Sequence, residues 1–383
     1  MPSLKIKPNR HSRVLKGHPW VYASEVQKSL STQYDGQVVE CRDAKGRFLG
    51  SGIYNSSSQI IWRRLSYQKV KLDEQFIRQR IQQAIIWRED LHDIRRLIWS
   101  ESDGLPGVVA DQYGKVLVVQ ILTLAMEKKR DLLVKVFSEE LKLDCILLRN
   151  DAPIRKHEGL DSYREVAYGK MPTPFWLKIN DIDYWLDFEE GQKTGFYLDQ
   201  RVQHQRIGKL AKGCNVLDAF CNQGSFALSC ANNGAKKVTA VDISQVTLGL
   251  AEKNAQHQGL DITFIQDNVF DFFQKKKDAF WDLIILDPPS FTKNKARLND
   301  ALRGYKELNL RALQSLKTNG ILATYSCSFH VDIQTFQEVV LKASVDAKRE
   351  VKLLEYAHQP SDHPVLIGMP ESEYLKGMIL QVS

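Results

Sequence analysis

Long apolar runs are missing from this sequence of 383 residues. A helix that spans a bilayer needs about 20 consecutive apolar residues, and no stretch here approaches that length. The basic N-terminal stretch also lacks the apolar core of a secretory signal. These absences exclude an integral membrane protein and argue against a secreted one.

Paired cysteines are missing as well. The six cysteines include no C-x-x-C pair and lie within otherwise apolar runs: Cys41, Cys145, Cys214, Cys221, Cys230 and Cys327. A zinc knuckle or a disulfide framework requires paired cysteines at suitable spacing. We therefore expect free thiols, no metal site and a reducing compartment, the cytoplasm.

The excess of positive over negative charge is confined to the first 70 residues. The net charge is +7, and residues 1–70 hold 12 Lys and Arg against 4 Asp and Glu. The remaining residues are nearly balanced, with 18 against 19 in 71–184 and 23 against 23 in 185–383. A basic block on a small module indicates a polyanionic partner. A chance skew on a solvated surface would look the same, so charge alone does not decide.

Three domains are predicted. Residues 1–70 read as short strands and turns, which is typical of a small β-barrel-like module. Residues 71–184 begin with helical spacing and continue as strand, hairpin, helix and strand, which predicts an α+β middle domain. A second hairpin turns at Asn180 and Asp181.

Residues 185–383 predict an α/β fold. Five apolar runs without polar alternation are separated by helical stretches, a pattern typical of a parallel sheet covered on both faces. Two further strands near the C-terminus bring the count to seven. Seven strands are typical of the Rossmann-like, doubly wound fold of methyltransferases.

Acidic residues end the predicted parallel strands, where ligands bind in open α/β sheets. Asp242 is placed to hold two ribose hydroxyls, and Asp267 with Asn268 to bind an adenine amino group. After Asp218, Gly224 allows a ligand to come close to the main chain. The helix that begins there favours a carboxylate at its amino end. Any one of these acids could simply be a solvated loop residue, but that explanation is weak for an acid at the end of each of four strands.

The loop after the first of these strands is a poor dinucleotide fingerprint. Cys221 and Asn222 stand where nicotinamide-binding loops carry glycine, which argues against a dehydrogenase. A fourth strand ends in Asp287-Pro288-Pro289-Ser290-Phe291. Two prolines stiffen this loop, so it is suited to hold an unpaired base, although Asp-Pro-Pro is often only a strand stop.

Cys327 ends the fifth strand, on the same side of the sheet as Asp287. Carbon 5 of a pyrimidine is too weak a nucleophile to attack a methyl sulfonium unaided. A thiolate that adds to carbon 6 activates carbon 5, and it leaves after a base has removed the carbon-5 proton. The alternative is a thiol packed under the loop, which is the usual environment of a free cysteine.

Six segments together resemble one enzyme family. They are LKGHPWVY, GQKTGFYLDQR (191–201), LDAFCNQGSF, LDPPSF, SCS and SDHPVLIGMPESEYLKG. From about Leu15 to the C-terminus the chain is similar to the RlmI-type 23S rRNA 5-methylcytosine methyltransferases. The resemblance implies an N-terminal PUA domain, a middle α+β domain, a catalytic domain that binds S-adenosylmethionine, 23S rRNA as partner, and often a homodimer.

The resemblance also implies roles for individual residues. Cys327 is expected to be the nucleophile and Asp287 to bind the cytosine edge, while Glu373 or Asp362 removes the proton, by analogy with 5-methyluridine enzymes. Pro288, Pro289 and Phe291 are expected to contact the base. The residues expected to bind the cofactor are Gln192, Thr194, Phe196, Gln200, Asp218, Phe220, Cys221, Gly224, Ser225, Phe226, Asp242, Ser244, Asp267, Asn268, Val269 and Asp287.

Two alternatives stay open. A sister group of guanine methyltransferases has a similar Asp-Pro-Pro loop and a KTGLFLDQR-like segment, but purine N-methylation needs no covalent nucleophile. Cys327 therefore favours the cytosine enzymes. A non-catalytic RNA-binding assembly factor would keep the basic front module, but it would not need the acids at the strand ends.

Overall fold

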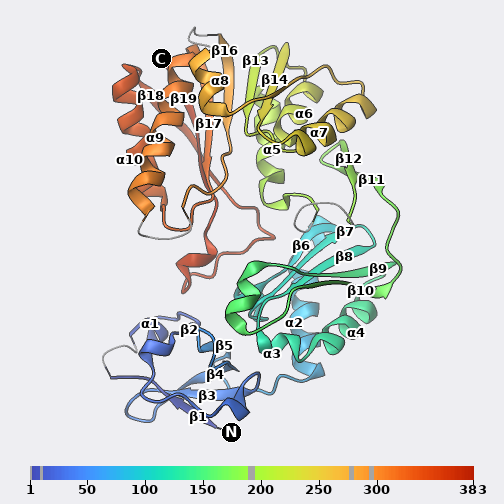
Figure 1. The fold of residues 1–383 in the computed structure, drawn as a ribbon, viewed down its shortest axis with the longest axis vertical. Coiled ribbons are helices and arrows are strands. Elements are labelled where there is room, and N and C mark those ends of the chain that lie inside the picture. Colours follow the sequence, from blue (N-terminus) through green and yellow to red (C-terminus); the bar gives the residue numbers. More distant parts are fainter. Residues whose placement is uncertain (1, 9–11, 189–194, 276–279, 293–296) are drawn as a thin grey trace. The chain divides into compact units, whose positions relative to one another are not determined.

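The computed structural model describes residues 2–8, 12–188, 195–275, 280–292 and 297–383. The chain divides into two compact units (Figure 1). The first comprises Met1–Phe175, Leu186–Leu198 and Ser361–Ser372, and the second comprises Trp176–Trp185, Asp199–Pro360 and Glu373–Ser383. The chain therefore passes between the units several times. The three-domain division at residues 70 and 184 stays a prediction.

The N-terminal part of the first unit, called the front module here, contains a five-stranded sheet in the order β1-β3-β4-β5-β2. Its elements are β1 (Ser3–Lys5), α1 (Ser12–Leu15), β2 (Trp20–Val21), β3 (Val38–Arg42), β4 (Phe48–Tyr54) and β5 (Trp62–Ser66). Strands β3 to β5 coincide with the apolar runs of the sequence. Strands β1 and β2 are too short to show an alternation. The buried indole of Trp62 donates a hydrogen bond to the Val39 carbonyl at 3.2 Å and anchors the core.

A second five-stranded sheet, in the order β10-β9-β8-β7-β6, forms the middle of the first unit. Its strands are β6 (Ile94–Trp99), β7 (Val108–Tyr113), β8 (Val116–Ile121), β9 (Cys145–Asn150) and β10 (Tyr163–Gly169). The helices packed on it are α2 (Glu74–Trp87), α3 (Leu124–Glu127) and α4 (Arg130–Glu140). Helix α2 begins where the Asp73 carboxylate accepts a hydrogen bond from the Phe76 N–H at 3.0 Å, which caps its first turn.

The second unit is built on a seven-stranded sheet in the order β15-β14-β13-β16-β17-β19-β18. Its strands are β13 (Asn215–Ala219), β14 (Lys237–Asp242), β15 (Thr263–Gln266), β16 (Trp281–Leu286), β17 (Leu316–Ser326), β18 (Val351–His358) and β19 (Lys376–Val382). Strands β13 to β17 run parallel to one another, and β19 is antiparallel to both β17 and β18.

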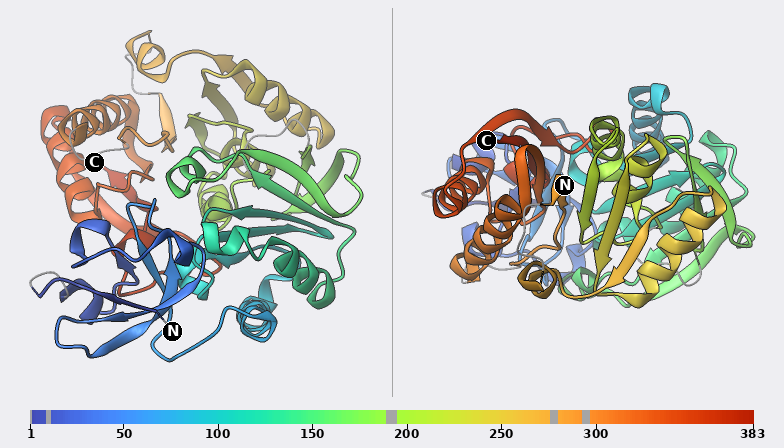
Figure 2. Two further views of the ribbon diagram at one scale, coloured as in Figure 1. Left: turned by 60° about the horizontal axis from the view of Figure 1, so that its bottom comes forward. Right: turned by 90° about the horizontal axis from the view of Figure 1, so that it is seen from above.

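Helices cover both faces of this sheet (Figure 2). One face packs against α5 (Arg201–Leu210), α6 (Ser225–Asn232) and α7 (Gln245–His257). The other packs against α8 (Val269–Lys275), α9 (Leu298–Ser315) and α10 (Ile333–Ala347). Burial on both faces explains why the strands read as continuous apolar runs.

The second hairpin, β11 (Phe175–Ile179) and β12 (Ile182–Leu186), packs on α7. The Trp185 N–H donates to the Asn254 side-chain oxygen at 3.0 Å, and the Asp183 N–H to that of Gln258 at 3.1 Å. Most of the hairpin thus belongs to the second unit, although the sequence grouped it with the middle domain.

The segment Ser361–Ser372 belongs to the first unit, although it lies near the C-terminus. The buried Arg88 guanidinium donates to the Asp362 carbonyl at 3.1 and 3.2 Å. The Glu371 carboxylate lies 3.1 Å from His18 Nε2 and 3.0 Å from Arg13 Nη2. These contacts hold the segment to α1 and the residues just before β2 in the front module and to the end of α2.

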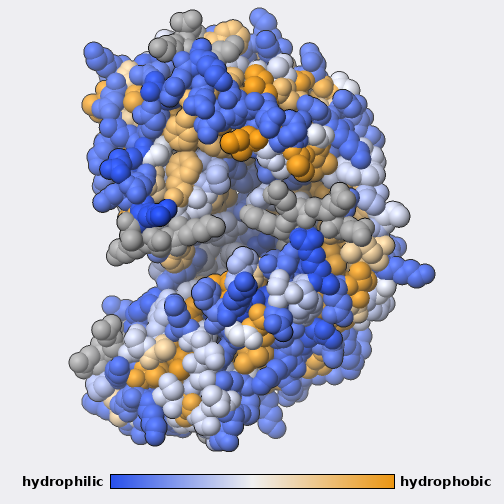
Figure 3. Space-filling model, viewed as in Figure 1, coloured by the Kyte–Doolittle hydropathy of each residue, from blue (hydrophilic) through white to orange (hydrophobic). Residues whose placement is uncertain are grey.

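Hydrophilic residues cover most of the face drawn in Figure 3, with separate apolar patches. Within the described ranges, every helix is too short or too polar to cross a membrane.

Candidate active site

The carboxyl ends of the five parallel strands carry the polar residues singled out by the sequence. Asp218 lies in β13 and Asp242 is the last residue of β14. Asp267, Asp287 and Cys327 directly follow β15, β16 and β17, respectively. Because neighbouring parallel strands end at one edge of a sheet, these residues share that edge.

Asp218 is a fully buried carboxylate. Its Oδ2 atom accepts a hydrogen bond from the Ala227 N–H at 2.9 Å. Its Oδ1 atom has no hydrogen-bond partner within the described part of the chain. Burial, with repulsion from Asp287 and Asp242, raises the pKa of Asp218 to about 8. Near neutral pH this side chain is therefore largely protonated and can donate as well as accept.

The loop between β13 and α6 is tightly wound. Phe220, Asn222 and Gly224 have φ values of 69°, 49° and 82°, all in the left-handed region. At Gly224 a Cβ atom would also lie 3.1 Å from Ala251 Cβ, which is a tight contact, so glycine is favoured by packing as well as by conformation. The loop brings the start of α6 to the same edge as Asp218.

Asp242 ties this loop to the next one. Its Oδ2 atom accepts from the Asn222 N–H at 2.9 Å, and its Oδ1 atom from the Ser244 N–H at 2.9 Å. The hydroxyl of Ser244 caps α7 by accepting from the Thr247 N–H at 3.4 Å. Each carboxylate oxygen keeps a second lone pair, so Asp242 can still accept two hydroxyl groups.

The side chains of Asp267 and Asn268 are used within their own loop. Lys275 pairs with the Asp267 carboxylate at 2.6 Å and holds its pKa below the usual value. The Asn268 side-chain oxygen accepts from the Phe270 N–H at 2.9 Å at the start of α8. Val269 is buried. An adenine amino group would therefore compete with Lys275 for the Asp267 carboxylate and with the Phe270 N–H for the Asn268 oxygen.

Three other predicted cofactor residues are buried in the core. Burial raises the pKa of the Cys221 thiol well above its ordinary value. Ser225 is hydrogen-bonded to the hydroxyl of Tyr184. The Phe226 ring lies edge-on to His204, with centroids 4.5 Å apart. These three side chains have packing contacts, and their contact with the cofactor stays a prediction.

The segment from Gln192 to Gln200 is described only in part. Gln192 and Thr194 lie outside the described residues. Phe196 belongs to the first unit, where its carbonyl accepts a hydrogen bond from the Tyr113 hydroxyl at 3.0 Å. Gln200 belongs to the second unit and is 4% exposed, and neither atom of its side-chain amide has a hydrogen-bond partner among the described residues. A buried amide without partners is expected only where a ligand or water completes it.

The Asp-Pro-Pro loop is anchored by its aromatic residue. Pro288 is buried and Pro289 is exposed. The Phe291 ring packs on Tyr305 of α9 at 4.6 Å and lies 3.2 Å from the position that a side chain on Gly304 would take. Because its ring is engaged on α9, Phe291 contributes more to the loop's position than to an open stacking surface.

Cys327 lies beside this loop, as expected from the sequence. Its half-buried Sγ atom is 3.9 Å from the Pro288 carbonyl oxygen. The neighbouring Ser328 hydroxyl bonds to the hydroxyls of Ser290 at 3.1 Å and Tyr305 at 2.9 Å. The serine after the cysteine thus joins the Asp-Pro-Pro loop, the end of β17 and α9 in one network.

Lys376 was missed by the sequence analysis. It begins β19 opposite Ser326 and is 3% exposed. Its ammonium group donates to the carbonyls of Ser328 at 2.9 Å and Tyr374 at 2.7 Å. Burial lowers its pKa to about 8, and the negative charges of Cys327, Glu373 and Asp332 oppose that shift. The available signal was a lysine directly before the apolar run Gly377–Leu380.

The two candidate bases differ in environment. Glu373 is half exposed and lies 3.5 Å from His358 Nδ1. Asp362 is fully buried in the first unit, where its oxygens bond to the Arg96 N–H at 3.0 Å and His363 Nδ1 at 2.9 Å. With both oxygens occupied, Asp362 serves the packing of that unit.

Known proteins resemble this chain over its whole length. A family model described as a PUA-like domain matches residues 4–67, and one described as an S-adenosylmethionine-dependent methyltransferase matches residues 156–364. The protein named ribosomal RNA large subunit methyltransferase I is 39% identical in Shewanella denitrificans and 38% identical in Shewanella amazonensis, with 99% of each chain covered. The chain belongs to the ribosomal RNA large subunit methyltransferase I family.

A crystal structure of a protein described as a methyltransferase, complexed with SAH, has the same fold, with a TM-score of 0.86, 23% identity and full coverage of both chains.

Members of the ribosomal RNA large subunit methyltransferase I family use S-adenosylmethionine, and so does this chain. Its residues fit such a cofactor. The unpartnered Oδ1 atom of Asp218 and the unpartnered amide of Gln200 are buried polar groups that a polar ligand would satisfy. The Asp242 carboxylate is held by two main-chain N–H groups and keeps free lone pairs.

Proposed function

We propose that this chain methylates carbon 5 of a cytosine in 23S rRNA and that Cys327 forms a covalent bond to carbon 6 during the reaction. The relatives' name supports the ribosomal RNA substrate. The observation that carries the covalent mechanism is the position of Cys327, whose Sγ atom lies 3.9 Å from the carbonyl of Pro288. Guanine methylation would not need a thiol there.

Within the proposal, the residues that would hold S-adenosylmethionine lie near the ends of β13 and β14 and at Gln200, just before α5. Asp242 accepts the two ribose hydroxyls, and Asp218 and Gln200 bond to polar atoms of the ligand. The start of α6, after Gly224, would hold the carboxylate of the cofactor. When bound, the cofactor supplies a methyl group on an electrophilic sulfonium.

The protein residues then act on the pyrimidine. The Cys327 thiolate adds to carbon 6, and the electron pair of the carbon 5–carbon 6 bond becomes available at carbon 5. After carbon 5 has been methylated, Glu373 takes its proton, the double bond re-forms and the thiolate leaves. Asp287 and the rigid Pro288-Pro289 turn bind the edge of the base.

Lys376 completes this arrangement. Its buried ammonium group forms no ion pair with a carboxylate within the described residues, and such a charge is costly without a counter-charge. A thiolate at Cys327 supplies one. We therefore assign to Lys376 the stabilisation of the reactive ionised form of the nucleophile.

The wider organisation is also part of the proposal. It comprises a PUA-like front module that binds RNA, a middle α+β domain, a class I methyltransferase domain of seven strands, a cytoplasmic location and a homodimer. Light scattering coupled to size-exclusion chromatography tests the dimer directly, since a monomeric mass at working concentration contradicts it.

RNA that contains 5-fluorocytosine tests the mechanism. Fluorine cannot leave as a cation, so the bond between Cys327 and carbon 6 cannot break after methylation. Wild-type protein with S-adenosylmethionine should give a protein–RNA band stable on a denaturing gel, and Cys327→Ala should give none. Cys214→Ala is the matched control, because Cys214 is the other half-buried cysteine. Methylation by Cys327→Ala at a rate near wild type would refute the covalent step and make guanine methylation the leading hypothesis.

A further inference from the structure

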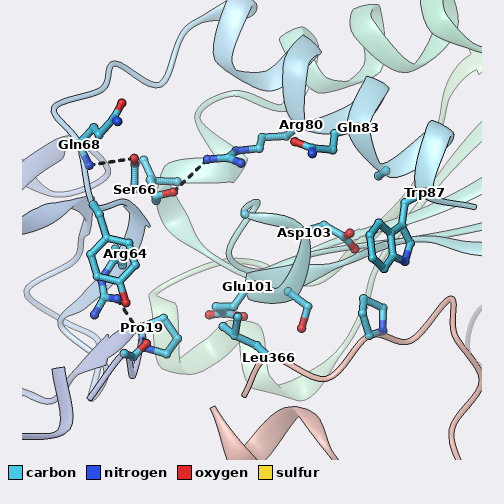
Figure 4. A pocket seen from close by; sticks show the side chains of 17 residues that line it. Pro19, Arg64, Ser66, Gln68, Arg80, Gln83, Trp87, Glu101, Asp103 and Leu366 are labelled. Carbon is cyan, nitrogen blue, oxygen red and sulfur yellow. Dashed lines mark hydrogen bonds between the residues drawn. The ribbon is translucent and has the colours of Figure 1, made fainter. Parts of the chain in front are cut away.

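A cavity of about 610 Å³ lies in the first unit, between the front module and the middle sheet (Figure 4). On one side it is lined by Arg64 of β5 and by the turn that follows this strand. On the other it is lined by α2 and by the short 3-10 helix η4 (Ser100–Asp103). The α2 residues in the lining are Arg80, Gln83, Ala84 and Trp87. They are three or four positions apart and so share one face of the helix.

Two aromatic side chains of this cavity are largely exposed. Trp87 is 71% exposed and Tyr67 is 64% exposed, although rings of this size are usually buried. The Arg64 guanidinium lies 4.1 Å from the centre of the Tyr67 ring. Figure 4 shows the Trp87 indole and Arg64 on opposite sides of the cavity. Within the described residues, no aromatic ring or cationic side chain stacks on the Trp87 indole, so its faces are available to a ligand.

The acids of the lining are already neutralised. Glu101 accepts from Arg63 at 2.9 Å and from the Trp20 indole at 2.6 Å. Asp103 accepts two hydrogen bonds from Arg88, at 2.8 and 3.0 Å. Both acids are therefore paired with arginines outside the lining and do not repel an anion as free carboxylates would.

The arginines of the lining have no such partners. Arg64 is buried, and its guanidinium donates to main-chain carbonyls such as that of His18 at 2.6 Å. Arg80 reaches the Leu65 carbonyl at 3.5 Å and lies 5.0 Å from the Phe76 ring centre. Neither forms an ion pair with a carboxylate in the described part of the chain. The cavity therefore carries a positive charge, which is complementary to a phosphate.

We propose that this cavity binds one unpaired nucleotide of the substrate RNA, with the base stacked on Trp87 and its phosphate next to Arg80. This rests on the proposed RNA substrate and adds a docking point distinct from the methylated base. An exposed aromatic face beside an arginine is the usual means of holding splayed-out RNA bases. A volume of about 610 Å³ is within the range of small-ligand sites. The basic front module forms one wall, so the same charge that attracts RNA brings it to the cavity.

Photochemical crosslinking tests the placement. RNA that carries 4-thiouridine is irradiated on the full-length protein, and tryptic peptides are analysed by mass spectrometry. Arg80 and Arg88 bound a peptide, 81–88, in which Trp87 is the only aromatic residue, and Arg64 and Lys69 bound a peptide, 65–69, that contains Tyr67. Crosslinks should concentrate in these two peptides. Crosslinks confined to other peptides overturn the proposal.

Substitutions test the energetics. Trp87→Ala should weaken binding of a single-stranded RNA about tenfold, because the base loses the aromatic ring on which it stacks. Trp87→Phe should keep most of the affinity. Ile86→Ala is the matched control, because Ile86 has the same 71% exposure on the same helix but is not part of the lining. Affinity is measured by fluorescence anisotropy at fixed salt, and folding by the affinity for S-adenosylmethionine, which should not change.

The outcomes separate this proposal from the proposed function. If Trp87→Ala binds and methylates RNA as well as the Ile86→Ala control, the docking site is wrong and the methyltransferase assignment stands. If wild-type protein gives no adduct with 5-fluorocytosine RNA, the covalent function fails whatever the cavity binds. Weakening of RNA binding by Ile86→Ala equal to that by Trp87→Ala would indicate a general effect on α2 and contradict the stacking role.

Discussion

Lys376 donates a hydrogen bond to the main-chain carbonyl of Ser328 at 2.9 Å, one residue beyond the proposed nucleophile. The two residues are separated by almost fifty positions in the sequence, and the pairing of β17 with β19 brings them together. A buried cation is thereby held at the end of the strand that carries Cys327.

Lys376→Met should slow alkylation of Cys327 about tenfold near neutral pH, because an opposite charge nearby shifts a pKa by about 1–3 units. The acidic limb of the methylation pH profile should move to higher pH. The rate is followed by mass spectrometry of the tryptic peptide 318–342, in which Cys327 is the only cysteine. Lys376→Arg should restore most of the reactivity. An unchanged alkylation rate in Lys376→Met, with normal folding, contradicts the role of the charge.

Asp218→Asn should alter the pH dependence of stability. Burial raises the pKa of Asp218 to about 8, so its favourable contribution is present in full below the ordinary value near 4 and is lost as pH rises through 8. The asparagine variant cannot ionise. Its free energy of unfolding, measured in urea, should therefore increase relative to wild type between pH 5 and pH 9. A constant difference between the two proteins across that range would show that Asp218 is not held protonated.

Asp242→Ala should weaken binding of S-adenosylmethionine by about 1–3 kcal/mol, because it leaves the ribose hydroxyls and two main-chain N–H groups without acceptors. Asp242→Asn should weaken binding less than Asp242→Ala, because the carbonyl oxygen of asparagine can still accept some of the hydrogen bonds from the ribose hydroxyls and the two main-chain N–H groups. Isothermal titration calorimetry measures the affinity. Equal affinities for wild type and both variants would remove Asp242 from the cofactor site.

Exposed lysines of the front module should determine how RNA binding depends on salt. Several arginines there are paired internally, such as Arg63 with Glu101, whereas Lys7, Lys16 and Lys28 are exposed. With about four phosphate contacts, log affinity should fall against log salt with a slope of about −3.

Replacing these three lysines by glutamine should flatten the slope by about 0.7 per lost contact. Lys142→Gln, at an exposed site of the middle sheet's domain, is the control. An unaltered slope in the triple variant would mean that these lysines, and the excess positive charge they provide, do not contact RNA. Substitution is preferable to deletion of residues 1–70, because Asn55 and Trp20 bond to Glu158 and Glu101 beyond the deleted part.

The sequence determined the doubly wound class, the acids at the strand ends and the cysteine after the fifth strand. These follow from local chemistry, because strands buried on both faces are continuous apolar runs and parallel strands bring their carboxyl ends to one edge. It also determined the charge of the front module, since charge is a property of composition.

Only the tertiary structure decided the partners of these residues. Sequence spacing could not show that Asp267 is occupied by Lys275, that Asp362 is buried against Arg96, or that Lys376 lies beside Cys327. The same holds for the cavity, where Trp87 of α2 and Tyr67 of the turn after β5 line one space. Such contacts join positions far apart in the chain, and burial and pairing, which set the pKa of each group, exist only once the chain has folded.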